Sequence, residues 1–224
     1  MAIKPILFNT EMVRAILDRR KSCTRRIIKP QWEECPHCKY VHNEYIYDKL
    51  AENVYCARCG YPLEPERRSP YQPGDILYVR ETWTEECGKY YYRADYDSDY
   101  LDPCETLSGG YPASCRNHPG CDGCMATSTR IHWRPSIHMP KEAARIWLKV
   151  TDVRVERLQE ITEVQAQAEG CNSGLLTGAC TARGQFEDLW NTTIKKSDIY
   201  RYGWDANPYV FVIEFERCEK PQEV

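Results

Sequence analysis

The residues best suited to do chemistry lie in a basic stretch from Asp18 to Arg26, with the sequence Asp-Arg-Arg-Lys-Ser-Cys-Thr-Arg-Arg. Lys21 and Thr24 are three residues apart in this stretch. Side chains at that spacing converge in a turn or a helix and point to opposite faces in a strand. Like charge disfavours the ammonium form of a lysine, and an uncharged amine can accept the proton of a nearby hydroxyl. The stretch therefore predicts a lysine–threonine site or, more plainly, a solvated basic turn.

Two cysteine pairs predict a metal site. They are Cys35-Pro-His-Cys38 and Cys56-Ala-Arg-Cys59, with 17 residues between them. A thiolate pair at this spacing can hold one side of a zinc ion, and two pairs complete a tetrahedral site. Four thiolates leave no open coordination position, so we expect a structural zinc ribbon. His37 and His42 are expected to be bystanders.

A second cysteine group follows between residues 95 and 131. The chain carries a third CxxC pair there, and two more cysteines could complete a second zinc site, whose expected ligands are Cys104, Cys115, Cys121 and Cys124. His118 could replace Cys104 or Cys115. Because the spacing is less regular, a polar loop with one accidental pair remains the alternative.

Composition limits the kinds of ligand and the cellular compartment that we expect for this chain. The chain has 224 residues, 13 cysteines and a formal net charge of -3, so a nucleic-acid site would have to be local rather than global. No apolar run has the length of a membrane span, and the N-terminus has no signal-peptide pattern. Many cysteines without an export signal indicate metal binding in a reducing compartment, so we expect a cytoplasmic protein without a membrane partner.

Hydrophobic patterning predicts an α+β fold around a mixed or antiparallel barrel. A helix is expected from Asn9 or Thr10 to about Arg19, another after the capping box Thr162-Glu-Val-Gln165, and short ones after Pro140 and over 185–191. The expected strands are 6–8, 26–30, 76–83, 89–94, 146–158 and 207–217.

Several of these pieces together resemble the ASCH domain, a branch of the PUA-like superfamily. They are Lys21-x-x-Thr24-x-Arg26, Pro-Gly-Asp-Ile-Leu-Tyr-Val, Ile161-Thr-Glu-Val-Gln-Ala-Gln-Ala-Glu-Gly170 and a terminal Val-Ile-Glu-Phe. The similarity covers residues 4–30, 71–95 and 133–217 and is greatest to phage and prophage proteins. It implies a small PUA-like β-barrel with flanking helices, formed by residues 1–30 and 70–224. The zinc ribbon (31–69) and the second cysteine region (95–131) would be insertions.

The resemblance also implies a site. Small bacterial ASCH proteins hydrolyse the amide of N4-acetylcytidine, and their catalytic set falls on Thr24 as nucleophile, Lys21 as base and Glu169 as proton donor. A nucleoside or RNA ligand would be contacted by Arg20, Arg25, Arg26, Glu81 and Trp83. The family pattern has a glycine where this chain has Arg19. An arginine there would cost about 1 kcal/mol if the position requires a left-handed backbone.

Three interpretations follow from these residues. The first is an amidohydrolase acting on an acylated cytidine. The second is a non-catalytic module for RNA or a modified base, in which an ion pair between Glu169 and Lys21 or Arg26 would hold the fold closed. The third is a phage assembly or host-takeover protein that uses its zinc regions for protein contacts.

Overall fold

A computed structural model describes residues 1–29, 31, 35, 37–39, 45–48, 53–63, 69–86, 88–96, 100–101, 129–130, 132–172 and 181–221. The expected second zinc ligands Cys104, Cys115, Cys121 and Cys124 lie outside these residues, as does His118. The chain divides into two compact units, described separately below. The first unit is Met1–Lys4, Ala15–Leu77 and Trp147–Val224, and the second is Pro5–Arg14 and Tyr78–Ile146.

The largest sheet has five strands in the order β1-β6-β11-β12-β2. These are β1 (Ile3–Leu7), β6 (Ile76–Arg80), β11 (Trp147–Arg157), β12 (Tyr209–Cys218) and β2 (Cys23–Ile27). β12 pairs antiparallel with β11 on one side and with β2 on the other. The expected α+β class is confirmed. The described strands form an open sheet with β2 at one edge, so the closed barrel implied by the resemblance is not seen among them.

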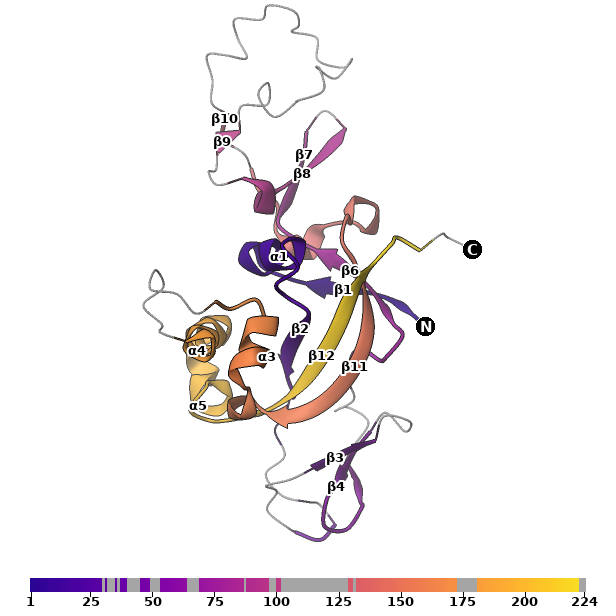
Figure 1. The fold of residues 1–224 in the computed structure, drawn as a ribbon, viewed down its shortest axis with the longest axis vertical. Helices are drawn as coiled ribbons and strands as arrows, with labels where there is room; N and C mark the ends of the chain where they lie inside the picture. Colours follow the sequence, from indigo (N-terminus) through magenta and orange to yellow (C-terminus); the bar gives the residue numbers. More distant parts are fainter. Residues whose placement is uncertain are drawn as a thin grey trace, which may run out of the picture. The chain divides into compact units, whose positions relative to one another are not determined.

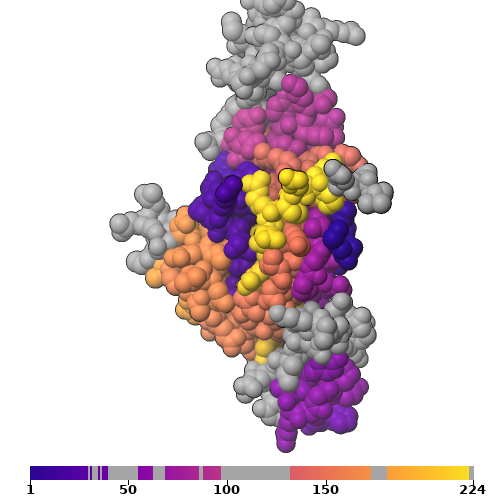
Figure 2. All heavy atoms as spheres, turned by 45° about the vertical axis from the view of Figure 1, so that its right-hand side comes forward, coloured from indigo at the N-terminus to yellow at the C-terminus, as the bar shows by residue number. Residues whose placement is uncertain are grey.

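A layer of helices packs on one face of this sheet (Figure 1). α3 (Glu163–Ala168), α4 (Ala182–Thr193) and α5 (Ile199–Tyr202) follow β11 in the chain. Phe186 and Trp190 of α4 pack in a buried cluster with Val210 and Val212 of β12. In the space-filling view the orange atoms of these helices gather into one continuous surface (Figure 2).

The capping box expected at the start of α3 is confirmed. The Thr162 hydroxyl accepts the backbone N–H of Gln165, and the Gln165 side chain accepts the backbone N–H of Thr162. Two donors that the first turn would leave unpaired are thereby satisfied. No helix in the described part of the chain is long and apolar enough to cross a membrane.

The basic stretch differs from expectation in one respect. A turn was expected to contain Thr24 and to precede a strand from Arg26, but β2 begins at Cys23. The difference arises because Cys23 to Ile27 pair in continuous register with Glu214 to Val210 of β12. Thr24 is therefore a strand residue, whereas Lys21 stays in the connection (Asp18–Ser22) that follows the first helix, α1 (Thr10–Leu17).

The segment of the first cysteine group forms a small antiparallel sheet, with β3 (Tyr45–Asp48), β4 (Asn53–Cys56) and β5 (Pro62–Leu63) in sequence order. It belongs to the first unit. Two of its cysteines, Cys56 and Cys59, lie at the end of β4 and in the turn that follows.

In the second unit the strand expected over 76–83 ends early, and β7 (Trp83–Glu86) begins a hairpin with β8 (Lys89–Tyr92). β9 (Tyr100–Leu101) pairs with β10 (Thr129–Arg130). Short 3₁₀ helices cover Arg93–Asp95, Ser136–His138 and Lys141–Ala143, and the last takes the place of the helix expected after Pro140. Two further 3₁₀ helices, Leu158–Glu160 and Lys196–Asp198, belong to the first unit.

Candidate functional site

Lys21 and Glu169 meet in a buried ion pair, although 148 positions separate them in the chain. The Lys21 ammonium donates to Glu169 Oε2 at 2.7 Å and to the Glu169 carbonyl at 2.9 Å. The two side chains are 0% and 3% exposed. The two residues also form an isolated antiparallel bridge through their backbones. The structure thus brings together two of the three residues that the resemblance assigns to catalysis.

Backbone hydrogen bonds to carbonyl groups of α1 and α3 hold the segment around Lys21 in place. The backbone N–H groups of Arg20 and Lys21 both donate to the carbonyl of Ala15, at 2.8 and 3.0 Å. The N–H of Ser22 donates to Ala168 at the end of α3, at 2.8 Å. Arg19 turns the chain between helix and bridge with a left-handed φ of 61°. The position at which the resemblance expects a glycine is therefore left-handed in this chain and is occupied by an arginine, at a steric cost.

Gly170 allows the close approach of Glu169 to Lys21. Its φ is +94°, and a Cβ at this position would lie 2.7 Å from the Ala15 Cβ and 3.3 Å from the Lys21 Cβ. Since no real side chain tolerates the shorter distance, only glycine fits between the end of α1 and the start of the bridge.

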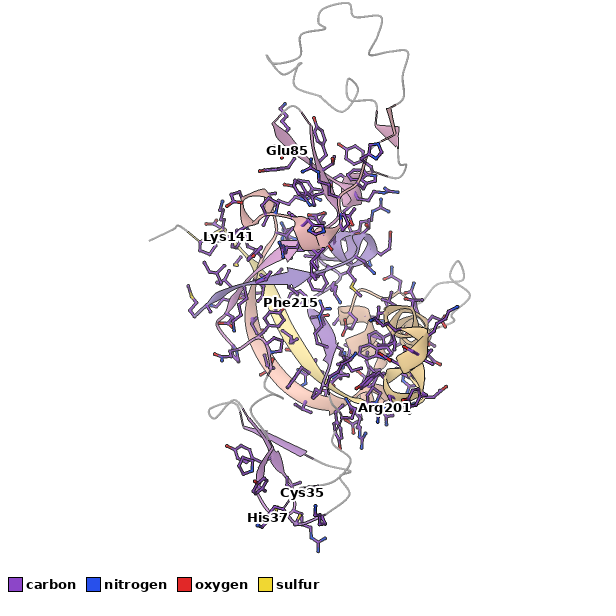
Figure 3. The ribbon with its side chains drawn as sticks, turned by 180° about the vertical axis from the view of Figure 1, so that it is seen from behind. Cys35, His37, Glu85, Lys141, Arg201 and Phe215 are labelled. Atoms are coloured by element: carbon purple, nitrogen blue, oxygen red, sulfur yellow. The ribbon has the colours of Figure 1, made fainter. Side chains whose placement is uncertain are left out.

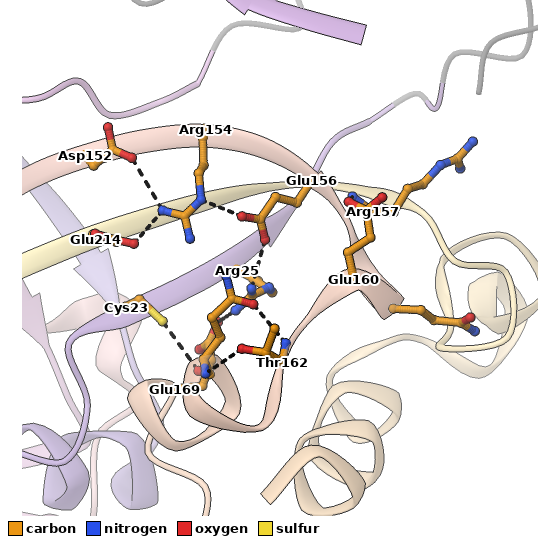
Figure 4. Close-up of polar contacts among 12 residues, drawn as sticks. Cys23, Arg25, Asp152, Arg154, Glu156, Arg157, Glu160, Thr162, Glu169 and Glu214 are labelled. Carbon is orange, nitrogen blue, oxygen red and sulfur yellow. Dashed lines mark hydrogen bonds and ion pairs between the residues drawn. The ribbon is translucent and has the colours of Figure 1, made fainter. Parts of the chain in front are cut away.

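Arg25 is buried beside the ion pair and is held by two carboxylates (Figure 4). Its Nη1 donates to Glu169 Oε1 at 3.3 Å and its Nη2 to Glu156 Oε2 at 3.0 Å, while its side chain is 0% exposed. Glu156 also pairs with Arg154 on the same strand, which contacts Asp152 and Glu214. Arg25 was expected to contact nucleic acid, but both of its terminal nitrogens are engaged inside the protein.

Thr24 is 3% exposed. Because side chains alternate along a strand, Thr24 and Arg26 face away from Cys23 and Arg25. Burial lowers the pKa of Arg26, and Tyr71 and Glu169 oppose this effect. The described hydrogen bonds of the Glu169 carboxylate go to Lys21 and Arg25, and none of them involves Thr24.

Tyr71 is a neighbour that sequence reasoning missed. Burial raises the pKa of its phenol, and the positive charge of Arg26 opposes this rise. Tyr71 begins the Tyr-Gln-Pro-Gly-Asp turn, and nothing in that turn chemistry signals proximity to a residue 45 positions earlier.

Two buried thiols, Cys23 and Cys171, lie near the ion pair. Burial, with a smaller contribution from Glu169, raises the pKa of Cys23 to about 12 and that of Cys171 to about 11. Since the thiolate is the nucleophilic form, burial keeps both thiols in their less reactive protonated form at neutral pH.

A shallow hollow of about 500 Å³ is lined by Arg20, Gln167, Ala168 and Asn172. These lining residues are close in sequence to Lys21 and Glu169. The Arg20 guanidinium borders the hollow while donating to the Gly170 carbonyl at 2.9 Å and to Asp18 at 3.0 Å. Among the arginines expected to contact a ligand, Arg20 is the one that borders a described hollow.

Glu81 and Trp83 belong to the second unit and are interior residues. The Glu81 side chain is 1% exposed, and Arg145 Nε and Nη2 donate to its two oxygens at 2.9 and 3.0 Å. Burial raises the pKa of Glu81, and Arg145 opposes that rise. Trp83 is 3% exposed, with the Arg134 guanidinium 5.1 Å from its ring centre. These contacts show a packing role for both residues, and their expected ligand contacts stay a prediction.

The four cysteines of the first group lie within reach of one ion. The Sγ atoms of Cys35, Cys38, Cys56 and Cys59 are all within 4.8 Å of one another. The Cys35–Cys59 and Cys38–Cys56 Sγ pairs are each 3.7 Å apart. Zinc–thiolate bonds of about 2.3 Å place two sulfurs of a tetrahedron about 3.8 Å apart, so these distances fit a zinc ion. Figure 3 shows Cys35 and His37 beside one another in this segment.

The two CxxC turns have the same backbone geometry. The N–H of Lys39 donates to the Cys35 carbonyl at 2.9 Å, and the N–H of Gly60 donates to the Cys56 carbonyl at 2.8 Å. Lys39 and Gly60 have left-handed φ angles of 58° and 66°. The first turn therefore has a lysine at the left-handed position where the second turn has glycine, the residue best suited to a positive φ.

Comparison of the chain with protein-family models, with curated proteins and with solved structures found no match.

Proposed function

We propose that residues 1–30 and 70–224 form an ASCH-type, PUA-like domain that binds a modified nucleoside, free or in RNA, and hydrolyses the amide of an N4-acylated cytidine. The observation that carries this proposal is the buried contact between Lys21 and Glu169. The resemblance assigns these two residues to one catalytic set, and the chain brings them to 2.7 Å from positions 148 apart.

The proposed reaction has two halves. In the first, the Lys21 amine takes the proton of the Thr24 hydroxyl, whose oxygen attacks the acyl carbonyl, and the Glu169 carboxylic acid gives its proton to the departing N4 amine. The amide C–N bond breaks and the acyl group remains on Thr24. In the second half, Glu169 takes a proton from water, which attacks the ester, and Lys21 returns a proton to the Thr24 oxygen.

The observed ion pair is one of the two charge states that this cycle requires. Ammonium and carboxylate are the forms present after the first half, whereas amine and carboxylic acid are needed to start it. One proton moved along the 2.7 Å hydrogen bond converts one state into the other. A low-dielectric, buried setting narrows the free-energy difference between the two states because it disfavours separated charge.

The test is deacetylation of N4-acetylcytidine by the purified protein. We expect turnover by the wild type and a loss of about 100-fold or more in Lys21→Met and in Glu169→Gln. The matched controls are Lys149→Met on β11 and Glu216→Gln on β12, both exposed strand residues, which should keep wild-type rates. Wild-type turnover no higher than that of Lys21→Met would overturn the proposal.

A binding-only module is the second candidate, favoured by the complete burial of Lys21 in its ion pair. A lysine that serves only as counter-ion to Glu169 needs no access to substrate. This candidate predicts that the nucleoside binds without turnover. For RNA, affinity should fall as salt rises, and Arg20→Gln should reduce that salt dependence.

We also propose that the first cysteine group holds a structural zinc ion. The 3.7 Å sulfur separations support it, and four thiolate ligands leave no position for a substrate. Thiolates kept free for metal are typical of a reducing compartment, which supports a cytoplasmic setting such as the host cell of a phage.

A further inference from the structure

We propose that Arg25 and Glu156 form a clamp that positions the carboxylate of Glu169, so that Glu169 exchanges its proton with Lys21 through one oxygen only. Arg25 is then a positioning residue rather than a contact for nucleic acid. The clamp is defined by hydrogen bonds already described, and only its consequence for turnover rests on the proposed function.

The geometry divides the two oxygens of Glu169 between two cations. Oε2 accepts from Lys21 at 2.7 Å, and Oε1 accepts from Arg25 Nη1 at 3.3 Å. A guanidinium is planar and permanently charged, so it holds an oxygen in a fixed direction without offering a proton for transfer. The oxygen shared with Lys21 is therefore the one at which a proton can move.

Glu156 fixes Arg25 from the opposite side. It accepts from Arg25 Nη2 at 3.0 Å and is itself held by Arg154, which also contacts Asp152 and Glu214. The clamp thus begins on β11 and β12 and ends at Glu169. With Lys21, Arg25, Glu156 and Glu169 all ionised, the buried group has no net charge, and a proton passing from Lys21 to Glu169 leaves that balance unchanged.

The charged or titratable groups described around Glu169 come from three parts of the chain. The segment through β2 contributes Lys21, Cys23, Arg25 and Arg26, β11 contributes Glu156, and the residues after α3 contribute Cys171. Arg25 and Glu156 have opposite charges and are directly linked. Removing Arg25 and removing Glu156 should therefore shift the pH at which Glu169 takes up a proton in opposite directions.

The first experiment does not need turnover. The carboxyl carbon of Glu169 is followed by NMR against pH, and the spectrum of Glu169→Gln identifies its signal. In Arg25→Met the midpoint pH should rise by about one unit or more, because a neighbouring cation is lost. In Glu156→Gln it should fall, because Arg25 no longer shares its charge with a second carboxylate. The exposed Arg217→Met on β12 should leave it unchanged.

Arg25→Met removes one cation from the buried Glu169 and the half-buried Glu156 and could unfold the protein, so Arg25→Lys and Glu156→Gln are measured beside it. Midpoints that move in the same direction in the Arg25 and Glu156 variants, or that do not move, would overturn the clamp. This result is independent of whether the wild type hydrolyses any substrate.

The second experiment applies to turnover. If the wild type deacetylates N4-acetylcytidine, Arg25→Lys should lower kcat about 10-fold while KM changes little, and Glu156→Gln should shift the pH–rate profile in the direction of the NMR midpoint. Absence of wild-type turnover rejects the hydrolase and leaves the NMR result to decide the clamp. Turnover with wild-type kcat and pH profile in both variants rejects the clamp alone.

Discussion

At the scale of single residues, Gly170 shows how little space the Lys21–Glu169 contact leaves. Gly74 in the same unit has nearly the same backbone, with φ +90° against +94°, but a Cβ added there would meet nothing within 4 Å. Comparing alanine at the two positions separates backbone strain from steric contact. The ion pair depends on the absence of a side chain at position 170, because a Cβ there would press on Ala15 and Lys21.

We expect Gly74→Ala to lower the free energy of unfolding by about 1 kcal/mol, the cost of a left-handed alanine. Gly170→Ala should cost about 3 kcal/mol, since overpacking adds to the same strain. Urea denaturation measures both. Equal losses in the two variants would show that the surroundings of Gly170 relax without cost.

The buried thiol of Cys23 makes the free energy of unfolding depend on pH in the alkaline range. Burial raises its pKa from 9.0 to about 12, so between these values the folded protein keeps a proton that the unfolded chain loses. Stability is then fully present below pH 9 and falls as pH rises through this window. The loss is at most about 1.4 kcal/mol per pH unit.

Cys23→Ala should therefore show a smaller decline in unfolding free energy than the wild type as pH rises above 9. Other buried groups titrate in both proteins, so the difference between the two slopes isolates Cys23. Chemical denaturation at several pH values measures it, and parallel slopes would contradict the assignment.

The residues of the site differ in how far sequence could predict them. Lys21 and Glu169 came from the family resemblance, because no local pattern pairs residues 148 positions apart. The clamp was missed because a charged residue at position 156 in a β-strand looks like any solvent-facing glutamate. Arg25 was expected to contact a ligand because a basic run is usually exposed, whereas the structure buries this position in the strand that pairs with β12.

At the scale of elements, the hydrophobic patterns located most helices and strands. β11, β12, α1 and the capped start of α3 follow the expectations within about two residues, because long periodic segments and capping boxes are strong local signals. β2 was placed too late because its start depends on pairing with a strand almost 190 residues away in sequence, which no local signal encodes. That difference places Thr24 in a strand.

The two CxxC turns form an element with its own test. We expect one zinc ion for the first cysteine group, so the double variant Cys35→Ser, Cys38→Ser should bind one zinc fewer per chain than the wild type. Zinc is counted on purified protein by elemental analysis. Because Cys104, Cys115, Cys121 and Cys124 are intact in both proteins, any second ion cancels in the comparison, and an unchanged count would reject the site.

At the scale of the whole molecule, the chain consists of a first unit that holds the Lys21–Glu169 pair and a second unit with its own partly buried Glu81–Arg145 pair. The α+β class was predictable from patterning. The open sheet was not, because barrel closure depends on strand tilt and register rather than on composition. The candidate site lies wholly in the first unit, so the predictions for it require nothing of the second.

The central claim is that Thr24 acts on substrate with the Lys21–Glu169 pair. The most direct test is rapid quenching of the protein with N4-acetylcytidine, followed by peptide mass spectrometry. We predict one added acetyl group on the peptide containing Thr24, more of it in Glu169→Gln if water attack is slowed more than acylation, and none in Thr24→Val. An acetyl group on another residue, or none on the wild type while cytidine is released, would contradict the account.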